Sequence, residues 1–193
     1  IDFLYLHNKE PFKYKNELQY YKEQSKSLEK IIKAYSKGVQ FPEYCNIDTF
    51  RFEVKSKKSR HINGLEIFNF LDLLNFDVYQ NMRDKILIEF SQVLILHQSV
   101  NMKLLDDKEQ LKLKDYLNTY YWNEILKSKH RHTFRNHKTK YNELLSKTGF
   151  NIHKELEQIF LNKLDELSSR ENKICTLSHL QDKKENYTHS HIY

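Results

Sequence analysis

The chain has 193 residues, of which 39% are hydrophobic and 13% aromatic, enough to bury a core of ordinary domain size. It contains three glycines and two prolines, which favours long helices and excludes a glycine-rich nucleotide-binding loop. The formal net charge is +6 and the sequence pI is near 9.1, so polyanions are the expected class of partner.

The cysteines bear on the cellular location of the protein, and the apolar runs bear on whether it crosses a membrane. Cys45 and Cys175 are two isolated thiols in a chain without a signal peptide, which predicts a reducing, cytoplasmic location. The longest apolar run, 86–96, is interrupted by polar residues and is too short to span a bilayer, so no membrane partner is expected. The chain begins with Ile1 rather than Met, which predicts a fragment or a processed product.

The first half of the chain predicts two strands and one helix. Residues 2–7 form a short apolar segment that predicts a strand. Residues 13–37 are polar, with apolar residues at helix-like spacing, and predict a helix that ends at Gly38. Residues 48–55 alternate, with Phe and Val on one side and Arg, Glu and Lys on the other, which predicts a strand with one buried face. An edge strand whose charges only discourage aggregation would give the same pattern.

The second half predicts helices. Leucine and phenylalanine recur at three-residue steps in 59–75, and longer amphipathic patterns cover 78–99, 107–127 and 151–168. From residue 171 onward the chain is polar, rich in histidine and without periodicity, so 171–193 is expected to be disordered.

A basic segment follows the amphipathic pattern at 107–127. Residues 127–140 contain six Lys or Arg, three His and no acid. A helix beginning at Arg131 would place Arg131, Arg135, Lys138 and Asn142 on one face, beside an apolar stripe. Helix, turn and basic helix over 107–147 resemble a helix-turn-helix unit, whose second helix lies on duplex DNA. A basic, solvated face on an ordinary bundle helix is the alternative.

Three blocks of this sequence together resemble a known family. The first is Phe3-Leu4-Tyr5-Leu6-His7 with Glu10, and the second is Thr49-Phe50-Arg51-Phe52-Glu53-Val54-Lys55 with the leucine-rich segment 70–74. The third is Arg131-His132-Thr133-Phe134-Arg135 with the apolar residues that follow it. Their order and spacing are similar to the C-terminal two-thirds of the filamentous-phage and plasmid rolling-circle replication initiators, the gene II/gene X family.

The resemblance implies an α+β, mostly helical fold. Residues 1–58 would be the remnant of a larger catalytic domain, with strands at about 2–7 and 48–55. Residues 59–170 would form a helical C-terminal domain with the helix-turn-helix-like unit at 107–147.

The resemblance also implies a chemistry. Family members nick an origin strand with a tyrosine and keep a phosphotyrosine link, which would make Tyr5 the nucleophile. A divalent Mg or Mn ion would stabilise the charge that develops on the phosphate. Its His-hydrophobic-His pair lies upstream of the tyrosine in the family, so we expect the ligands mostly outside this chain and no metal site within it. Lys9, Glu10 and Glu53 would complete the catalytic set.

The expected partner is the DNA of a replication origin, in the cytoplasm of a bacterial host, with host replication machinery as a further candidate. The phosphate contacts are assigned to the basic side chains of the third block and its surroundings: Lys127, Lys129, Arg131, Arg135, Lys138 and Lys140.

Two other functions fit parts of the sequence. Arg131 and His137 match the loose Arg-X(4–6)-His pattern of the HEPN ribonucleases, all-helical and metal-independent enzymes in which His acts as a general acid or base and Arg stabilises charge. This pattern arises easily by chance in a basic segment and leaves the two strands unexplained. The other function is a DNA-binding module without enzymatic activity.

Overall fold

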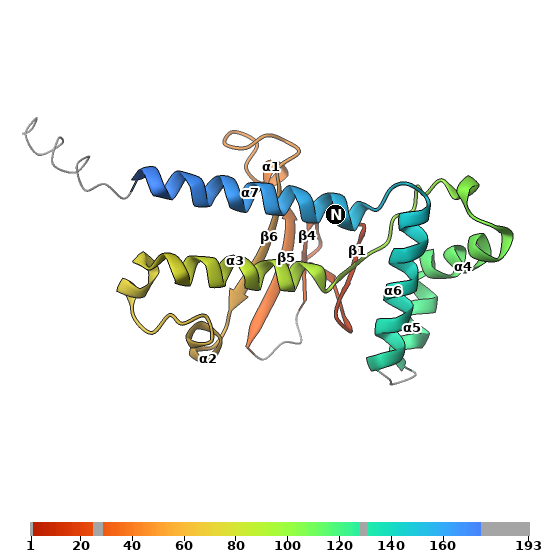
Figure 1. Cartoon of the computed structure of the whole chain (residues 1–193), viewed down its shortest axis with the longest axis horizontal. Coiled ribbons are helices and arrows are strands. Elements are labelled where there is room, and N and C mark those ends of the chain that lie inside the picture. Colours follow the sequence, from red (N-terminus) through yellow and green to blue (C-terminus); the bar gives the residue numbers. More distant parts are fainter. Residues whose placement is uncertain (1, 25–28, 128–130, 175–193) are drawn as a thin grey trace, which may run out of the picture. The chain divides into compact units, whose positions relative to one another are not determined.

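The computed structural model describes residues 2–24, 29–127 and 131–174 (Figure 1). The fold is mixed α and β and mostly helical, as the sequence predicts. Residues up to Glu157 form one compact unit, and the chain from Gln158 onward belongs to a second unit that contains most of the last helix. No helix within the described ranges has both the length and the apolar character needed to cross a bilayer.

The first sheet joins the start of the chain to its middle. Strands β1 (Leu4–His7), β2 (Glu10–Pro11) and β7 (Val93–Ile95) are antiparallel and follow the order β2-β1-β7. The predicted strand at 2–7 is confirmed. The predicted division of the chain at residue 58 stays a prediction, but β1 and β7, which lie on either side of that position, share this sheet.

The second sheet contains the predicted 48–55 strand and corrects one expectation. Its antiparallel strands are β3 (Lys13–Lys15), β4 (Leu18–Glu23), β5 (Lys30–Ser36) and β6 (Phe50–Ser56), in that order. The helix predicted for 13–37 is therefore wrong. On β5 the two fully buried residues are Ile32 and Ala34, two apart, and Tyr35 is also buried. Ala34 lies opposite the buried Phe52 of β6, so pairing as a strand determines the structure of this segment.

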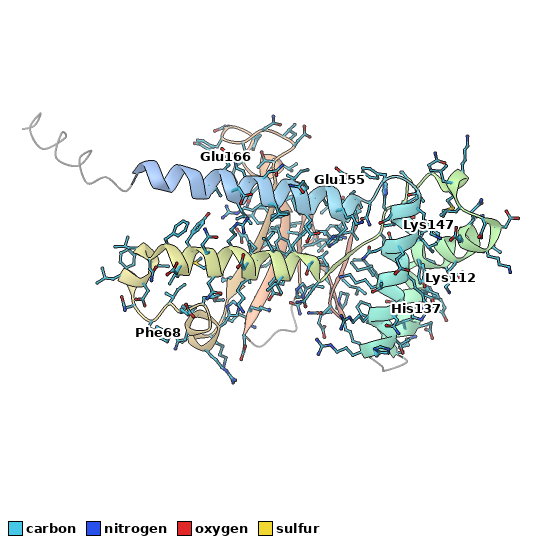
Figure 2. The ribbon with its side chains drawn as sticks, in the orientation of Figure 1. Phe68, Lys112, His137, Lys147, Glu155 and Glu166 are labelled. Atoms are coloured by element: carbon cyan, nitrogen blue, oxygen red, sulfur yellow. The ribbon has the colours of Figure 1, made fainter. Side chains whose placement is uncertain are left out.

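A short helical region follows the second sheet. Helix α1 (Lys37–Gln40) includes Gly38, where a Cβ would come within 2.0 Å of the Asn46 carbonyl oxygen, so only glycine fits. Helix α2 (Ser59–Asn63) and the 3-10 helix η1 (Phe70–Leu74) make the predicted 59–75 region only partly helical. Its apolar stripe is not buried: Phe68 (Figure 2) and four of the five η1 residues are exposed.

The remaining helices include two further corrections. Helix α3 (Phe76–Ser91) is followed directly by β7, so the helix predicted for 78–99 ends early. The helix predicted for 107–127 is two helices, α4 (Asp107–Leu117) and α5 (Thr119–Lys127), because Asn118 caps the second one by accepting from the Tyr120 amide. A 3-10 turn, η2 (Met102–Leu104), precedes them.

Helices α6 (Arg131–Lys147) and α7 (Ile152–Ile174) complete the fold. Helix α7 runs past the predicted start of the tail at residue 171, and residues 175–193, including Cys175, lie outside the described residues. Gly149, with φ of 83°, forms the turn between the two helices.

The core of the first unit joins the first sheet to the helices. Leu6 of β1 and Leu94, next to it on β7, pack with an aromatic group that includes Tyr116, Trp122 and Tyr141 from α4, α5 and α6. The indole Nε1 of Trp122 donates to the Tyr116 carbonyl oxygen at 2.7 Å, so this polar atom is satisfied inside the core. The helices that follow β7 are therefore held against the N-terminal strand by one continuous core.

Candidate nucleic-acid interface

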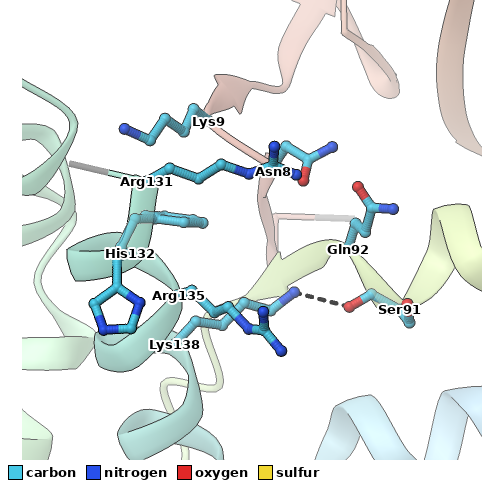
Figure 3. A pocket seen from close by; sticks show the side chains of 9 residues that line it. Asn8, Lys9, Ser91, Gln92, Arg131, His132, Arg135 and Lys138 are labelled. Carbon is cyan, nitrogen blue, oxygen red and sulfur yellow. Dashed lines mark hydrogen bonds between the residues drawn. The ribbon is translucent and has the colours of Figure 1, made fainter. Parts of the chain in front are cut away.

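A basic cleft lies where three segments of the chain meet (Figure 3). Its volume is about 1030 Å³, and it is bounded by the β1–β2 turn, the end of α3 and the first two turns of α6. The nine lining residues include four cations and no acid: Asn8, Lys9, Ser91, Gln92, Arg131, His132, Phe134, Arg135 and Lys138. We call this the basic cleft.

The wall formed by the β1–β2 turn depends on a left-handed residue. Asn8 has φ of 54°, a conformation that asparagine tolerates better than most residues, and this allows a two-residue turn between His7 and Glu10. The Asn8 backbone amide donates to the Gln92 carbonyl oxygen at 3.1 Å. The turn, with Lys9 on it, is thereby attached to the end of α3.

The wall formed by α6 follows from its amphipathic sequence. Phe134 and Tyr141 are buried, which directs the opposite side of the helix outward. The predicted helix is confirmed, and so is the shared face of Arg131, Arg135 and Lys138, because all three line the basic cleft. Asn142, predicted on the same face, lines a separate surface hollow instead.

Lys138 is the most enclosed cation of the cleft. Its Nζ donates to the carbonyl oxygen of Ser91 at 2.8 Å, across from α6 to the end of α3. Burial lowers the pKa of Lys138 to about 8, although the charge of Glu157 acts in the opposite direction. At pH 7 roughly a tenth of this side chain is therefore uncharged.

The other predicted DNA-binding residues are not gathered in the basic cleft. Lys127 is exposed and forms an ion pair with Glu124 at 2.7 Å. Lys140 lines a different hollow, which it shares with the acids Glu109 and Glu143. Lys129 lies outside the described residues. The cleft instead contains Lys9, which the sequence assigned to catalysis.

Tyr5 is held by hydrogen bonds to α5. Its hydroxyl lies 2.6 Å from the Asn123 Oδ1 and 3.0 Å from the Thr119 carbonyl oxygen, both acceptors. Burial raises the pKa of this phenol, and the hydrogen bond to Asn123 opposes the shift only in part. Tyr5 does not line the basic cleft. Its predicted role as nucleophile stays a prediction, and these contacts do not activate it.

The predicted catalytic acids lie on different sheets. Glu10 is on β2, opposite His7. Glu53 is on β6 of the second sheet, where it accepts from the Tyr35 hydroxyl at 2.7 Å and pairs with Arg51 at 2.9 Å. Glu53 therefore pairs with a basic residue of its own strand, and its predicted catalytic role stays a prediction.

The described residues do not fit a divalent metal site. No group of three or more His, Cys, Asp or Glu side chains converges anywhere in the described ranges. A hard cation such as Mg²⁺ needs several oxygen ligands in near-octahedral geometry. We therefore derive no reaction step through a metal from the residues of this chain.

Sequence reasoning missed a buried charged group, formed by Glu89 with His7 and Lys30. The imidazole Nε2 of His7 is 2.9 Å from one carboxylate oxygen of Glu89, and the Lys30 ammonium bonds the other. Burial alone would raise the pKa of Glu89, but the hydrogen bonds from His7 and Lys30 outweigh it and lower the pKa to about 2. The available signal was a single glutamate within an apolar run.

Arg131 and His137, the pair of the ribonuclease alternative, lie at different sites. Arg131 lines the basic cleft, whereas His137 does not. The Nδ1 of His137 is 3.0 Å from the Tyr121 hydroxyl and 3.1 Å from the Tyr116 hydroxyl, and Lys112 bonds the same Tyr121 hydroxyl (Figure 2). Burial lowers the pKa of His137, with smaller contributions from Lys112 and Lys140.

Comparison of the chain with protein-family models, with curated proteins and with solved structures finds no match.

Proposed function

We propose that the basic cleft binds the phosphodiester backbone of DNA, and that this chain is the DNA-binding part of a rolling-circle replication initiator. The observation that supports this most directly is the composition of the cleft, where Lys9, Arg131, Arg135 and Lys138 meet without an acid among the lining residues. Cations brought together in this way repel one another, and an anion in the cleft removes that repulsion.

The four cations come from two separate segments of the chain, which favours a binding site rather than a basic face that is only solvated. Lys9 comes from the β1–β2 turn and the other three come from α6, so the positive charge is assembled by the fold. A solvated basic face on a bundle helix needs only residues of that helix. Asn8, Gln92 and His132 add hydrogen-bonding groups that suit a nucleic-acid ligand.

In the intact protein we assign origin nicking and strand transfer to the catalytic domain, with Tyr5 as the nucleophile and the ligands of a Mg or Mn ion upstream of this chain. The basic cleft binds the DNA and orients it. The proposed partners are origin DNA and host replication proteins, in the cytoplasm of a bacterial host.

A DNA-binding module without enzymatic activity is the second candidate. The specific observation in its favour is the Tyr5 hydroxyl, which bonds to α5 and has a raised pKa. A phenol in this state is a poor nucleophile without further activation.

The proposed binding is tested by removing two cleft cations. We expect the double variant Arg131→Ala/Arg135→Ala to bind duplex DNA about tenfold or more weakly, because two phosphate contacts are lost. The matched control is Lys103→Ala/Lys108→Ala, which removes the same charge at two exposed lysines away from the cleft. Equal losses in the two double variants would show that only net charge matters and would overturn the proposal.

A further inference from the structure

The amine of Lys138 is placed differently from an ordinary surface lysine. It lines the basic cleft, it is partly buried, and its hydrogen-bond acceptor is a neutral carbonyl, that of Ser91. No carboxylate of the described residues lies within ion-pair distance of its Nζ; Glu157 acts on it only through its charge. An enclosed amine without an ion-pair partner is the environment in which lysine acts as a nucleophile.

The chemistry of a nucleophilic lysine requires the uncharged amine. Burial lowers the pKa of Lys138 to about 8, so the neutral form is available under ordinary conditions. The bond to Ser91 is compatible with that form, since a neutral amine still donates an N–H to a carbonyl and keeps its lone pair. The groups that face Lys138 include His153, whose pKa is lowered chiefly by burial and also by the charge of Lys138.

A nucleic acid offers one common electrophile to such an amine. Where a base has been lost, the deoxyribose opens to an aldehyde at C1′, next to the phosphates that Lys9, Arg131 and Arg135 are placed to hold. We propose that Lys138 forms an imine with this aldehyde and that the chain thereby cleaves DNA at abasic sites. This inference rests on the proposed DNA binding.

The reaction needs only water and a base. The Lys138 nitrogen attacks C1′, and loss of water gives the imine. Removal of a proton from C2′ then breaks the C3′–O bond, so the downstream strand leaves with a 5′-phosphate, and water hydrolyses the imine to release Lys138. His132 lines the same cleft and provides an imidazole that can take the C2′ proton.

Another buried lysine shows why the position of Lys138 matters. Burial also lowers the pKa of Lys22, but its Nζ donates to the Leu4 carbonyl oxygen and lies over the Tyr14 ring. Lys22 does not line the basic cleft, so DNA bound there does not reach it. Lys138 differs from Lys22 because its amine has a lowered pKa and also lies in the cleft where we propose that phosphates bind.

The test is reductive trapping on an oligonucleotide duplex that contains one abasic site. Sodium borohydride reduces an imine to a stable amine, so the protein becomes covalently attached to the labelled strand. We expect an adduct with the unaltered chain and a decrease of about tenfold or more in Lys138→Arg, which keeps the positive charge but has no nucleophilic amine. Lys85→Arg, at an exposed lysine of α3, is the control and should give the full adduct.

Binding of the same oligonucleotide is measured in parallel by fluorescence anisotropy. If the chain binds the DNA but gives no adduct, or if Lys138→Arg gives as much adduct as the unaltered chain, the imine inference is wrong and the proposed function stands. If the chain does not bind the DNA at all, both are overturned.

Discussion

The hydroxyl of Tyr141 donates to the carbonyl oxygen of Ile95 at 2.9 Å and accepts from the backbone amide of His97 at 3.1 Å. One buried side chain of α6 thereby satisfies two backbone groups at the end of β7. These bonds fix α6 against the first sheet, the sheet whose β1–β2 turn carries Lys9. The two walls of the basic cleft are positioned by this contact.

Tyr141→Phe should destabilise the protein by about 1–3 kcal/mol, because it leaves a buried carbonyl and a partly buried amide without their partner. Urea unfolding followed by circular dichroism measures the loss. Tyr120→Phe, at an exposed tyrosine of α5, is the control and should leave the unfolding midpoint unchanged. An unchanged midpoint for Tyr141→Phe would mean that α6 is held mainly by its apolar contacts.

Because of Glu89, the free energy of unfolding should decrease as the pH falls into the acid range. Its pKa is lowered in the folded state from the ordinary 4.5 to about 2, so its stabilisation is complete above about 4.5 and is lost as the pH falls toward 2. The contribution is on the order of 3 kcal/mol, since one pKa unit corresponds to about 1.4 kcal/mol.

Glu89→Gln should flatten this acid dependence and also lower stability at pH 7, because Lys30 loses its charged partner. The measurement is the free energy of unfolding in urea at intervals between pH 2 and 7. Glu124→Gln, at an exposed glutamate, is the control. Parallel curves for the unaltered chain and Glu89→Gln would contradict the assignment to Glu89.

Tyr5→Phe should separate binding from catalysis. In this chain it should leave DNA affinity unchanged, since Tyr5 does not line the basic cleft, and should cost about 1 kcal/mol of stability through the lost hydrogen bond to α5. In the intact protein with Mg²⁺ or Mn²⁺ and supercoiled origin DNA, we expect a covalent protein–DNA adduct that Tyr5→Phe abolishes. An adduct that survives the substitution would assign the nucleophile to another residue.

His137→Ala addresses the ribonuclease alternative. We expect no change in RNA stability on incubation with the chain, and a loss of about 1 kcal/mol in folding because the Tyr116 and Tyr121 hydroxyls lose a shared partner. A gel assay with labelled single-stranded RNA provides the readout. RNA cleavage that disappears in His137→Ala would favour the ribonuclease function.

The sequence predicted the elements in which one periodicity dominates. The alternation of Phe50 and Phe52 with charged residues predicted β6, and the spacing of Phe134 and Tyr141 predicted α6. Residues 30–36 satisfy two periods at once, because Ile31, Ile32 and Tyr35 fit a helix while Ile32 and Ala34 fit a strand. Pairing with β6, which lies later in the chain, decides between them, and no local pattern records that pairing.

The candidate site was predictable only in part. The cations of α6 could be found from their spacing within one helix. Lys9 is more than a hundred residues away in sequence, and its place beside Arg131 depends on β1 pairing with β7. The low pKa of Lys138 arises from burial against Ser91, which is a property of packing and not of sequence.

The most direct test of the account is the salt dependence of DNA binding. The affinity of the chain for a duplex is measured between about 50 and 200 mM salt, and the slope of log affinity against log salt is compared with that of Arg131→Ala/Arg135→Ala. We predict a steep slope for the unaltered chain and a slope shallower by about two in the double variant, because each lost phosphate contact removes about one counterion. Identical slopes would show that these arginines do not contact phosphate, and would contradict the basic cleft as the DNA-binding site.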